Sequence, residues 1–151
     1  MLPSRDVYGG WPNSGEIDIA EAVGCTSGKV YGTVHTGTYN HVKNTHLGSD
    51  YFTNLSKWHD FTIDWLDSQM KWYVDGQHYH TFAPDTRSSD QWPFSQKFYL
   101  LLNVAVGGSW GGFCLRGAPS CSQESEFGSD QTMQVDFVRV HKLTPKIQIK
   151  G

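Results

Sequence analysis

The sequence has little charge, few cysteines and no long apolar run. Asp, Glu, Lys and Arg make up 18% of its 151 residues, and the formal net charge is -3. Because this balance offers no basic patch for a phosphate backbone, no nucleic-acid partner is expected. No stretch approaches the roughly 18 apolar residues of a membrane-spanning helix, so no membrane association is expected either. No apolar segment of a signal peptide follows Met1–Arg5.

The three cysteines do not decide the redox compartment. Cys114 and Cys121 are close enough in sequence to close a loop as a disulfide, which would leave Cys25 unpaired. Three free thiols are equally allowed, so the pairing stays open.

Aromatic residues and glycines are abundant instead. Aromatics form 14% of the chain, including six tryptophans, and there are 16 glycines. Together with the low charge, this composition is typical of an all-β domain with tight turns. Flat apolar rings also suit a carbohydrate-binding surface, although ordinary packing in a β core accounts for most of them. The length fits one domain.

Alternating apolar and polar residues predict a series of strands with turn signals between them. The turns Asp67-Ser68 and Asp75-Gly76 each predict a β-hairpin. The polar segment 37–57 is predicted to be a long loop, and the nearly continuous apolar run 97–106 a strand buried on both faces. The strands are expected at 15–23, 29–36, 59–66, 70–75, 77–83, 97–106 and 132–142. No helical period extends beyond a turn, so the sequence predicts an antiparallel β-sandwich or jelly roll.

Three acids crowd one predicted strand, within the segment 15–21. On a regular strand Glu16 and Asp18 share one face, while Glu21 points away. One extra residue, a β-bulge near positions 19–20, would return Glu21 to the face of the other two acids. Like charges so close together repel each other, which calls for a functional reason. A strand face of solvated acids is the alternative, and the spacing alone gives the two interpretations equal weight.

Paired carboxylates of this kind suit one chemistry in particular. Two carboxyl groups about 5–5.5 Å apart serve a retaining glycosidase, in which one attacks the anomeric carbon and the other protonates the leaving oxygen. Crowding raises the pKa of one acid, which keeps that acid protonated near neutral pH.

The segment Gly10–Glu21, with the sequence GWPNSGEIDIAE, resembles the catalytic signature of glycoside hydrolase family 16. Its Glu-x-Asp-x-x-Glu spacing is similar to the bulged branch of that family, which holds laminarinases (endo-β-1,3-glucanases) together with some agarases and carrageenases. The shorter Glu-x-Asp-x-Glu spacing belongs to lichenases and xyloglucan transferases. The resemblance continues in family order through 34–36, 58–65, 71–76, 102–110 and 133–140.

The resemblance implies a role for each acid. Glu16 would be the nucleophile, and Glu21 would be the general acid and then the general base. Asp18 would hydrogen-bond to the nucleophile and tune the titration of the pair.

The resemblance also implies substrate contacts around these acids. Trp11 and Trp110 would line the sugar subsites, and His35 would sit in the cleft beside the catalytic strand. For each of these rings, the alternative is a packing residue of the core or the rim.

A concanavalin A-like jelly roll is the fold that the resemblance implies, with this chain as a truncated C-terminal portion. Residues 1–143 would be a partial family 16 catalytic domain, and residues 144–151 a tail. In the family, several strands precede the stretch that Met1-Leu2-Pro3 resembles. Those strands would carry part of the glucan cleft and, in the full-length domain, ligands of a structural calcium, one of which Asp136 resembles. Neither a metal nor another cofactor is therefore expected in this chain.

The implied function is retaining, endo-acting hydrolysis of β-glucan, with β-1,3-glucan of the laminarin type as the substrate. The expected partner is the polysaccharide, the expected state is a monomer, and an extracellular location follows from the resemblance alone. A second hypothesis is a recognition protein that binds glucan without cutting it, although such relatives usually lose the two glutamates that this chain retains. A third is a fragment with an intact motif and little activity. The linkage stays open among β-1,3-glucan, mixed-linkage glucan and a marine galactan.

Overall fold

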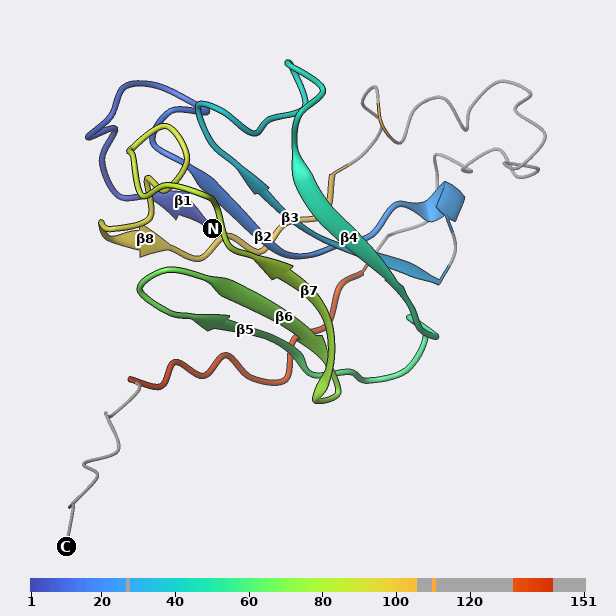
Figure 1. Cartoon of the computed structure of the whole chain (residues 1–151). Coiled ribbons are helices and arrows are strands. Elements are labelled where there is room, and N and C mark those ends of the chain that lie inside the picture. The colour runs from blue at the N-terminus through green and yellow to red at the C-terminus, as the bar shows by residue number, and fades with distance from the viewer. Residues whose placement is uncertain (27, 106–109, 111–131, 143–151) are drawn as a thin grey trace, which may run out of the picture.

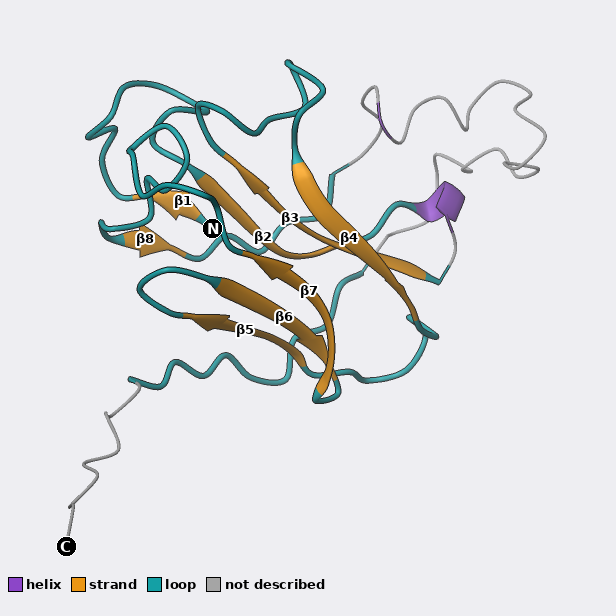
Figure 2. Cartoon of the chain, in the orientation of Figure 1, coloured by secondary structure: helices purple, strands orange, loops and turns teal. Residues whose placement is uncertain are grey.

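The computed structural model describes residues 1–26, 28–105, 110 and 132–142 (Figure 1). In these residues the chain forms antiparallel strands and a short 3-10 turn, η1, which confirms the predicted all-β class (Figure 2). The elements are β1 (Leu2–Pro3), β2 (Glu16–Glu21), η1 (Gly24–Thr26), β3 (Lys29–His35), β4 (Leu47–Phe52), β5 (Phe61–Trp65), β6 (Met70–Val74), β7 (Gln77–Phe82) and β8 (Phe98–Tyr99). No helical segment in the described residues has the length and apolarity to cross a membrane. The predicted tail 144–151 and the cysteines Cys114 and Cys121 lie outside the described residues.

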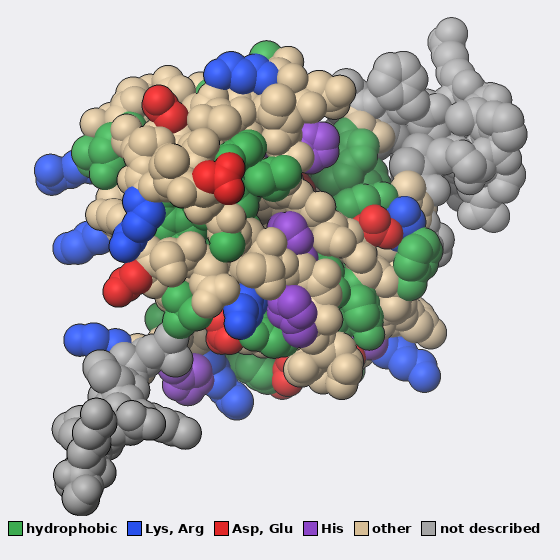
Figure 3. Space-filling view, in the orientation of Figure 1, with side chains coloured by type: hydrophobic (Ala, Val, Ile, Leu, Met, Phe, Trp, Pro, Cys, Tyr) green, Lys and Arg blue, Asp and Glu red, His purple; other side chains and the backbone are tan. Residues whose placement is uncertain are grey.

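Two three-stranded sheets make up most of the fold. β3 lies between β2 and β4, β6 lies between β5 and β7, and β1 pairs with β8. The two larger sheets lie one above the other in Figure 1 and share one core. Ile17 and Val34 enter that core from the first sheet, and Trp72 and Phe82 enter it from the second. On the face shown in Figure 3, acidic and basic side chains are scattered among polar and apolar ones.

A glycine allows a close approach between the two sheets. A Cβ atom on Gly32 would lie 2.5 Å from a ring carbon of Trp72, so any larger residue would collide with the indole. The same indole donates its Nε1 hydrogen to the backbone oxygen of Asp18 at 2.9 Å. The second sheet therefore supports β2 from beneath, at the position of its central acid.

An aromatic cluster supports the start of β2. Phe82 stacks on Trp92 with ring centroids 5.8 Å apart, and Trp92 meets Phe94 edge to face at 5.2 Å. Gly15 immediately precedes β2 and has a φ of 88°. A Cβ atom at this position would lie only 2.9 Å from the ring of Phe94. Both the backbone conformation and the space favour glycine there.

Both predicted hairpins are confirmed. Asp75 and Gly76 have φ values of 50° and 76°, the two left-handed residues of a type I′ turn, and they connect β6 to β7. The turn between β5 and β6 is closed by a backbone hydrogen bond of 3.0 Å from Leu66 to Gln69.

The predicted loop at 37–57 is wrong in part, because it contains β4 (Leu47–Phe52). This strand pairs with β3 along its whole length. Its sequence, LGSDYF, includes a glycine and an aspartate and does not alternate, so it carries no period-two signal. Backbone hydrogen bonds to β3 stabilise β4, and such bonds depend little on the side chains.

The predicted strands at 97–106 and 132–142 are also wrong in the described residues. The first is reduced to β8 (Phe98–Tyr99), and the second forms no strand. The apolar residues after β8 lie at the surface; Leu102, for example, is 58% exposed. An apolar run becomes a buried strand only where a neighbouring strand accepts its hydrogen bonds, and no described strand does so here.

Candidate active site

The three acids of β2 share one face because the ladder between β2 and β3 contains a bulge. The register pairs Glu16 with His35, Ile17 with Val34, Asp18 with Thr33, and Glu21 with Tyr31. From Asp18 to Glu21 the strand β2 advances by three residues while β3 advances by two, so β2 has one extra residue at positions 19–20. This extra residue returns Glu21 to the face of Glu16 and Asp18, and the predicted bulge is confirmed.

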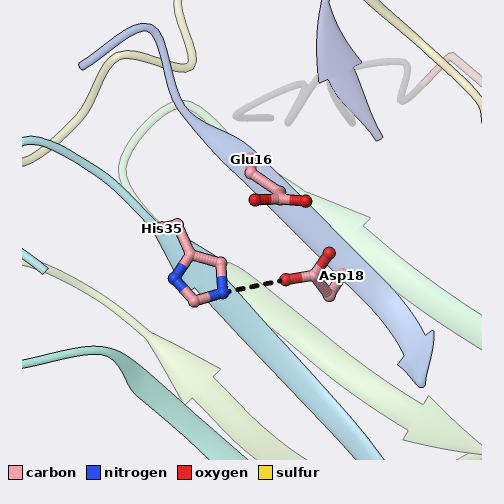
Figure 4. Close-up of side chains that lie close together, drawn as sticks. All are labelled: Glu16, Asp18 and His35. Carbon is pink, nitrogen blue, oxygen red and sulfur yellow. Dashed lines mark ion pairs between the residues drawn. The ribbon is translucent and has the colours of Figure 1, made fainter. Parts of the chain in front are cut away.

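Glu16, Asp18 and His35 form the centre of this face (Figure 4). One oxygen or nitrogen atom of each side chain lies within 4.8 Å of the other two. His35 Nε2 is 3.4 Å from Asp18 Oδ2, and each of these two side chains is 11% exposed. Burial by itself lowers the pKa of His35, but the ion-pair contact with Asp18 and the nearby carboxylates outweigh burial and raise that pKa. His35 therefore lies among the acids, as predicted, in direct contact with Asp18.

Glu21 titrates well above an ordinary carboxyl group. Burial is the largest cause, followed by the negative charges of Asp18 and Glu16, and together they raise the pKa of Glu21 to about 7. The charges of His35 and of the Met1 amino group oppose this shift in part. A carboxyl group with this pKa holds a proton below neutral pH and can accept one back near neutrality, as an acid and base must.

Trp11 lies beside the first acid, in the loop that precedes β2. Its Nε1 donates a hydrogen bond to Glu16 Oε2 at 2.6 Å, which orients the carboxylate. The indole is 44% exposed, so it is a surface ring rather than a core ring. The structure thus brings Trp11 together with Glu16, and the predicted role of Trp11 in lining a sugar subsite stays a prediction.

Trp110 lies at the other end of the row of acids. Its ring meets Tyr31 edge to face with centroids 5.3 Å apart, and Tyr31 is the cross-strand partner of Glu21. Trp110 is 52% exposed. Trp11 and Trp110 therefore flank the acids at opposite ends, beside Glu16 and Glu21 respectively.

Sequence reasoning missed His41, which belongs to the loop between β3 and β4. Its ring centroid is 5.1 Å from that of Trp11 and 5.2 Å from that of His35. No residue pattern could have indicated this position, because the contact depends on how the loop folds back toward β2.

Asp136, which resembles a calcium ligand of the family, belongs to no described group of three or more acidic, histidine or cysteine side chains that could hold a metal ion. In the described part of the chain, the one such group is Glu16, Asp18 and His35, which is the centre of the face already described.

An antiparallel β fold that presents paired carboxylates between exposed aromatic rings is the arrangement of a carbohydrate-active domain. Residues 1–116 match the family model for glycosyl hydrolases family 16, and the chain belongs to this family. The resemblance that the motif indicated is therefore confirmed.

Two relatives from one bacterium illustrate the likeness. The chain is 43% identical over 122 residues to a β-glucanase of Rhodothermus marinus, an alignment that covers 74% of this chain and 42% of the relative. The crystal structure of the laminarinase from Rhodothermus marinus superposes with a TM-score of 0.70 at 41% identity, over 74% of this chain and 48% of that one. Because family 16 laminarinases have a jelly-roll fold, the predicted architecture is confirmed.

A third relative has a name that describes binding. The β-1,3-glucan-binding protein of Penaeus monodon is 39% identical over 198 residues, covering 95% of this chain and 53% of the relative. The chain thus spans about half the length of these relatives.

Proposed function

We propose that this chain provides the catalytic face of a retaining endo-β-glucanase and that β-1,3-glucan is its substrate. One observation carries the proposal: the bulge in β2 places Glu21 on the face of Glu16 and Asp18, where burial and two negative charges raise its pKa to about 7. A retaining glycosidase needs this combination of one carboxylate that attacks and one carboxylic acid that still holds its proton.

The two glutamates divide the reaction between them. Glu16 attacks the anomeric carbon, and the glycosidic bond breaks while Glu21 gives its proton to the leaving oxygen. Glu21, now ionised, then takes a proton from a water molecule whose oxygen attacks the anomeric carbon and displaces Glu16. Each substitution inverts the carbon once, so the product keeps the β configuration. The hydrogen bond from Trp11 supports this role by orienting the Glu16 carboxylate.

Asp18 acts through its charge rather than through a bond to carbon. It is the second cause, after burial, of the raised pKa of Glu21, and it lies 3.4 Å from the His35 imidazole. The charge of Asp18 therefore helps to keep Glu21 protonated for the first step. The charge of His35 acts in the opposite direction and lowers the pKa of Glu21 in part.

The nature of the substrate is supported by the relatives. Three of them, at 39% to 43% identity, are named β-glucanase, laminarinase and β-1,3-glucan-binding protein. A keratan-sulfate endo-1,4-β-galactosidase of Sphingobacterium multivorum is less similar, at 35% identity over 146 residues. A polymer of β-1,3-linked glucose is therefore the substrate that we propose. A polymeric substrate that cannot enter a cell also favours an extracellular location, and we propose a monomer.

Binding without hydrolysis is the second candidate, and the relative from Penaeus monodon favours it. The presence of both glutamates with the geometry described above favours hydrolysis instead. The two candidates differ in one measurement, the release of new reducing ends from glucan.

The test compares the full-length protein with Glu16→Gln and Glu21→Gln variants on β-1,3-glucan. We expect the wild type to release reducing ends. The activity of each variant should be at least about 100-fold lower than that of the wild type. Asp85→Asn removes a charge from an exposed loop after β7 and should leave the activity unchanged. Proton NMR of the fresh product should show the β anomer first. Binding without any new reducing ends would favour the recognition protein, and early α anomer would exclude Glu16 as the nucleophile.

A further inference from the structure

An aromatic wall stands at one end of the row of acids. It consists of Trp11, His35 and His41, whose ring centroids are separated by 5.1 to 5.8 Å. Trp11 is 44% exposed and His41 is also exposed, so these two rings face solvent, whereas His35 is buried. The hydrogen bond from Trp11 to Glu16 makes the wall continuous with the proposed nucleophile.

The loop that carries His41 is folded by its own hydrogen bonds. Asn40 is 1% exposed, and its side-chain amide donates to the backbone oxygen of Thr36 at 3.0 Å. The side-chain oxygen of Asn40 accepts a hydrogen bond from the backbone of Lys43, also at 3.0 Å. These contacts brace the backbone on both sides of His41, so the loop position that places its ring beside Trp11 is formed before a ligand arrives. Preorganisation of this kind reduces the entropy cost of binding.

The proposed mechanism determines which way the substrate chain runs along the row of acids. The leaving oxygen must lie near Glu21, and the anomeric carbon must lie near Glu16. The aromatic wall adjoins Glu16, whereas Trp110 and Tyr31 lie beside Glu21. The wall therefore borders the sugar whose anomeric carbon is attacked and the units on its non-reducing side.

We propose that His41 is a sugar-contacting residue that determines specificity on this non-reducing side, an inference that rests on the proposed function. A neutral imidazole offers one hydrogen-bond donor and one acceptor, which matches two adjacent hydroxyl groups of a glucose unit. The indole of Trp11 provides an apolar face for the same unit. The ligand is thus a β-linked glucose unit of a neutral glucan. His41 recognises it by hydrogen bonds, and Trp11 packs against its ring.

Binding can be measured separately from catalysis in a Glu16→Gln background of the full-length protein. Titration calorimetry with a β-1,3-linked glucose hexasaccharide should show affinity about tenfold weaker for His41→Ala, because up to two hydrogen bonds are lost. His41→Gln keeps a donor and an acceptor and should recover part of the loss. In the catalytically intact protein, His41→Ala should raise KM more than it lowers kcat. His78→Ala, an exposed histidine of β7 in the other sheet, should leave both measurements unchanged.

The outcomes separate this inference from the proposed function. An unchanged affinity in His41→Ala, with normal binding by the unsubstituted protein, would overturn the inference alone. A parallel fall in melting temperature without rescue by His41→Gln would assign His41 a structural role and also overturn it. If the protein binds no β-glucan at all, the proposed function fails and the inference fails with it.

Discussion

Removal of the Asp18 charge should lower the pKa of Glu21 and move the alkaline limb of hydrolysis to lower pH. Burial is the largest cause of the raised pKa of Glu21, about 7, and the charge of Asp18 is the second. Asn has nearly the same shape as Asp, so Asp18→Asn removes the charge and leaves the burial in place. Glu21 must hold its proton for the first step, so activity should disappear at a lower pH in the variant.

The size of the shift follows from the spacing on the strand. Successive positions on one face of a strand lie about 7 Å apart. With an effective dielectric between about 20 and 80, a unit charge at that distance changes a pKa by about 0.4 to 1.7 pH units. The loss of Asp18 also lowers the pKa of His35, and a less charged His35 favours the ionisation of Glu21 less, which offsets part of the shift. The net shift should therefore be about 0.5 to 1 pH unit.

The assay is the pH dependence of kcat/KM on β-1,3-glucan for the wild type and Asp18→Asn. Asp85→Asn makes the same change of charge at an exposed position outside β2 and β3 and serves as the matched control. An alkaline limb that stays in place or moves upward in Asp18→Asn would refute the role of Glu21 as an acid under the influence of Asp18.

Three further outcomes are expected. Because folding raises the pKa of Glu21 from 4.5 to about 7, the folded state binds that proton more tightly, and stability should fall as pH rises from 4.5 to about 7. Glu21→Gln should flatten this dependence in melting curves, and an equal slope would contradict the burial of Glu21. Gly32→Ala should cost about 1–3 kcal/mol in denaturant unfolding, because its Cβ would lie 2.5 Å from Trp72. Gly24→Ala, whose Cβ would meet nothing within 4 Å, should cost much less, and equal costs would contradict the packing. In Glu16→Ala, azide should give an α-configured adduct by NMR, whereas Glu21→Ala with an activated aryl glycoside should give a β-configured one. If the two configurations were reversed, Glu21 would be the nucleophile and Glu16 the general acid and base.

Features that depend on neighbours in the chain were predictable from the sequence. The spacing of Glu16, Asp18 and Glu21 allowed a bulge, because one extra residue in a strand of period two brings all three acids to one face, and the family resemblance favoured that arrangement. The Asp75-Gly76 pair predicted its hairpin, because two left-handed residues are what a type I′ turn requires. The motif also identified the family, and with it the expected chemistry, hydrolysis by a pair of carboxyl groups.

Features that depend on segments far apart in the chain were decided by the tertiary structure alone. β4 forms because β3 offers it backbone partners, although LGSDYF has no strand pattern of its own. The apolar run after β8 is exposed because no described strand pairs with it. The place of His41 beside Trp11 depends on hydrogen bonds inside its loop, and the pKa of Glu21 depends on how deeply the folded chain buries it. Local spacing thus determined which residues could carry the chemistry, whereas long-range contacts decided their surroundings, because burial and strand pairing are properties of the assembled fold.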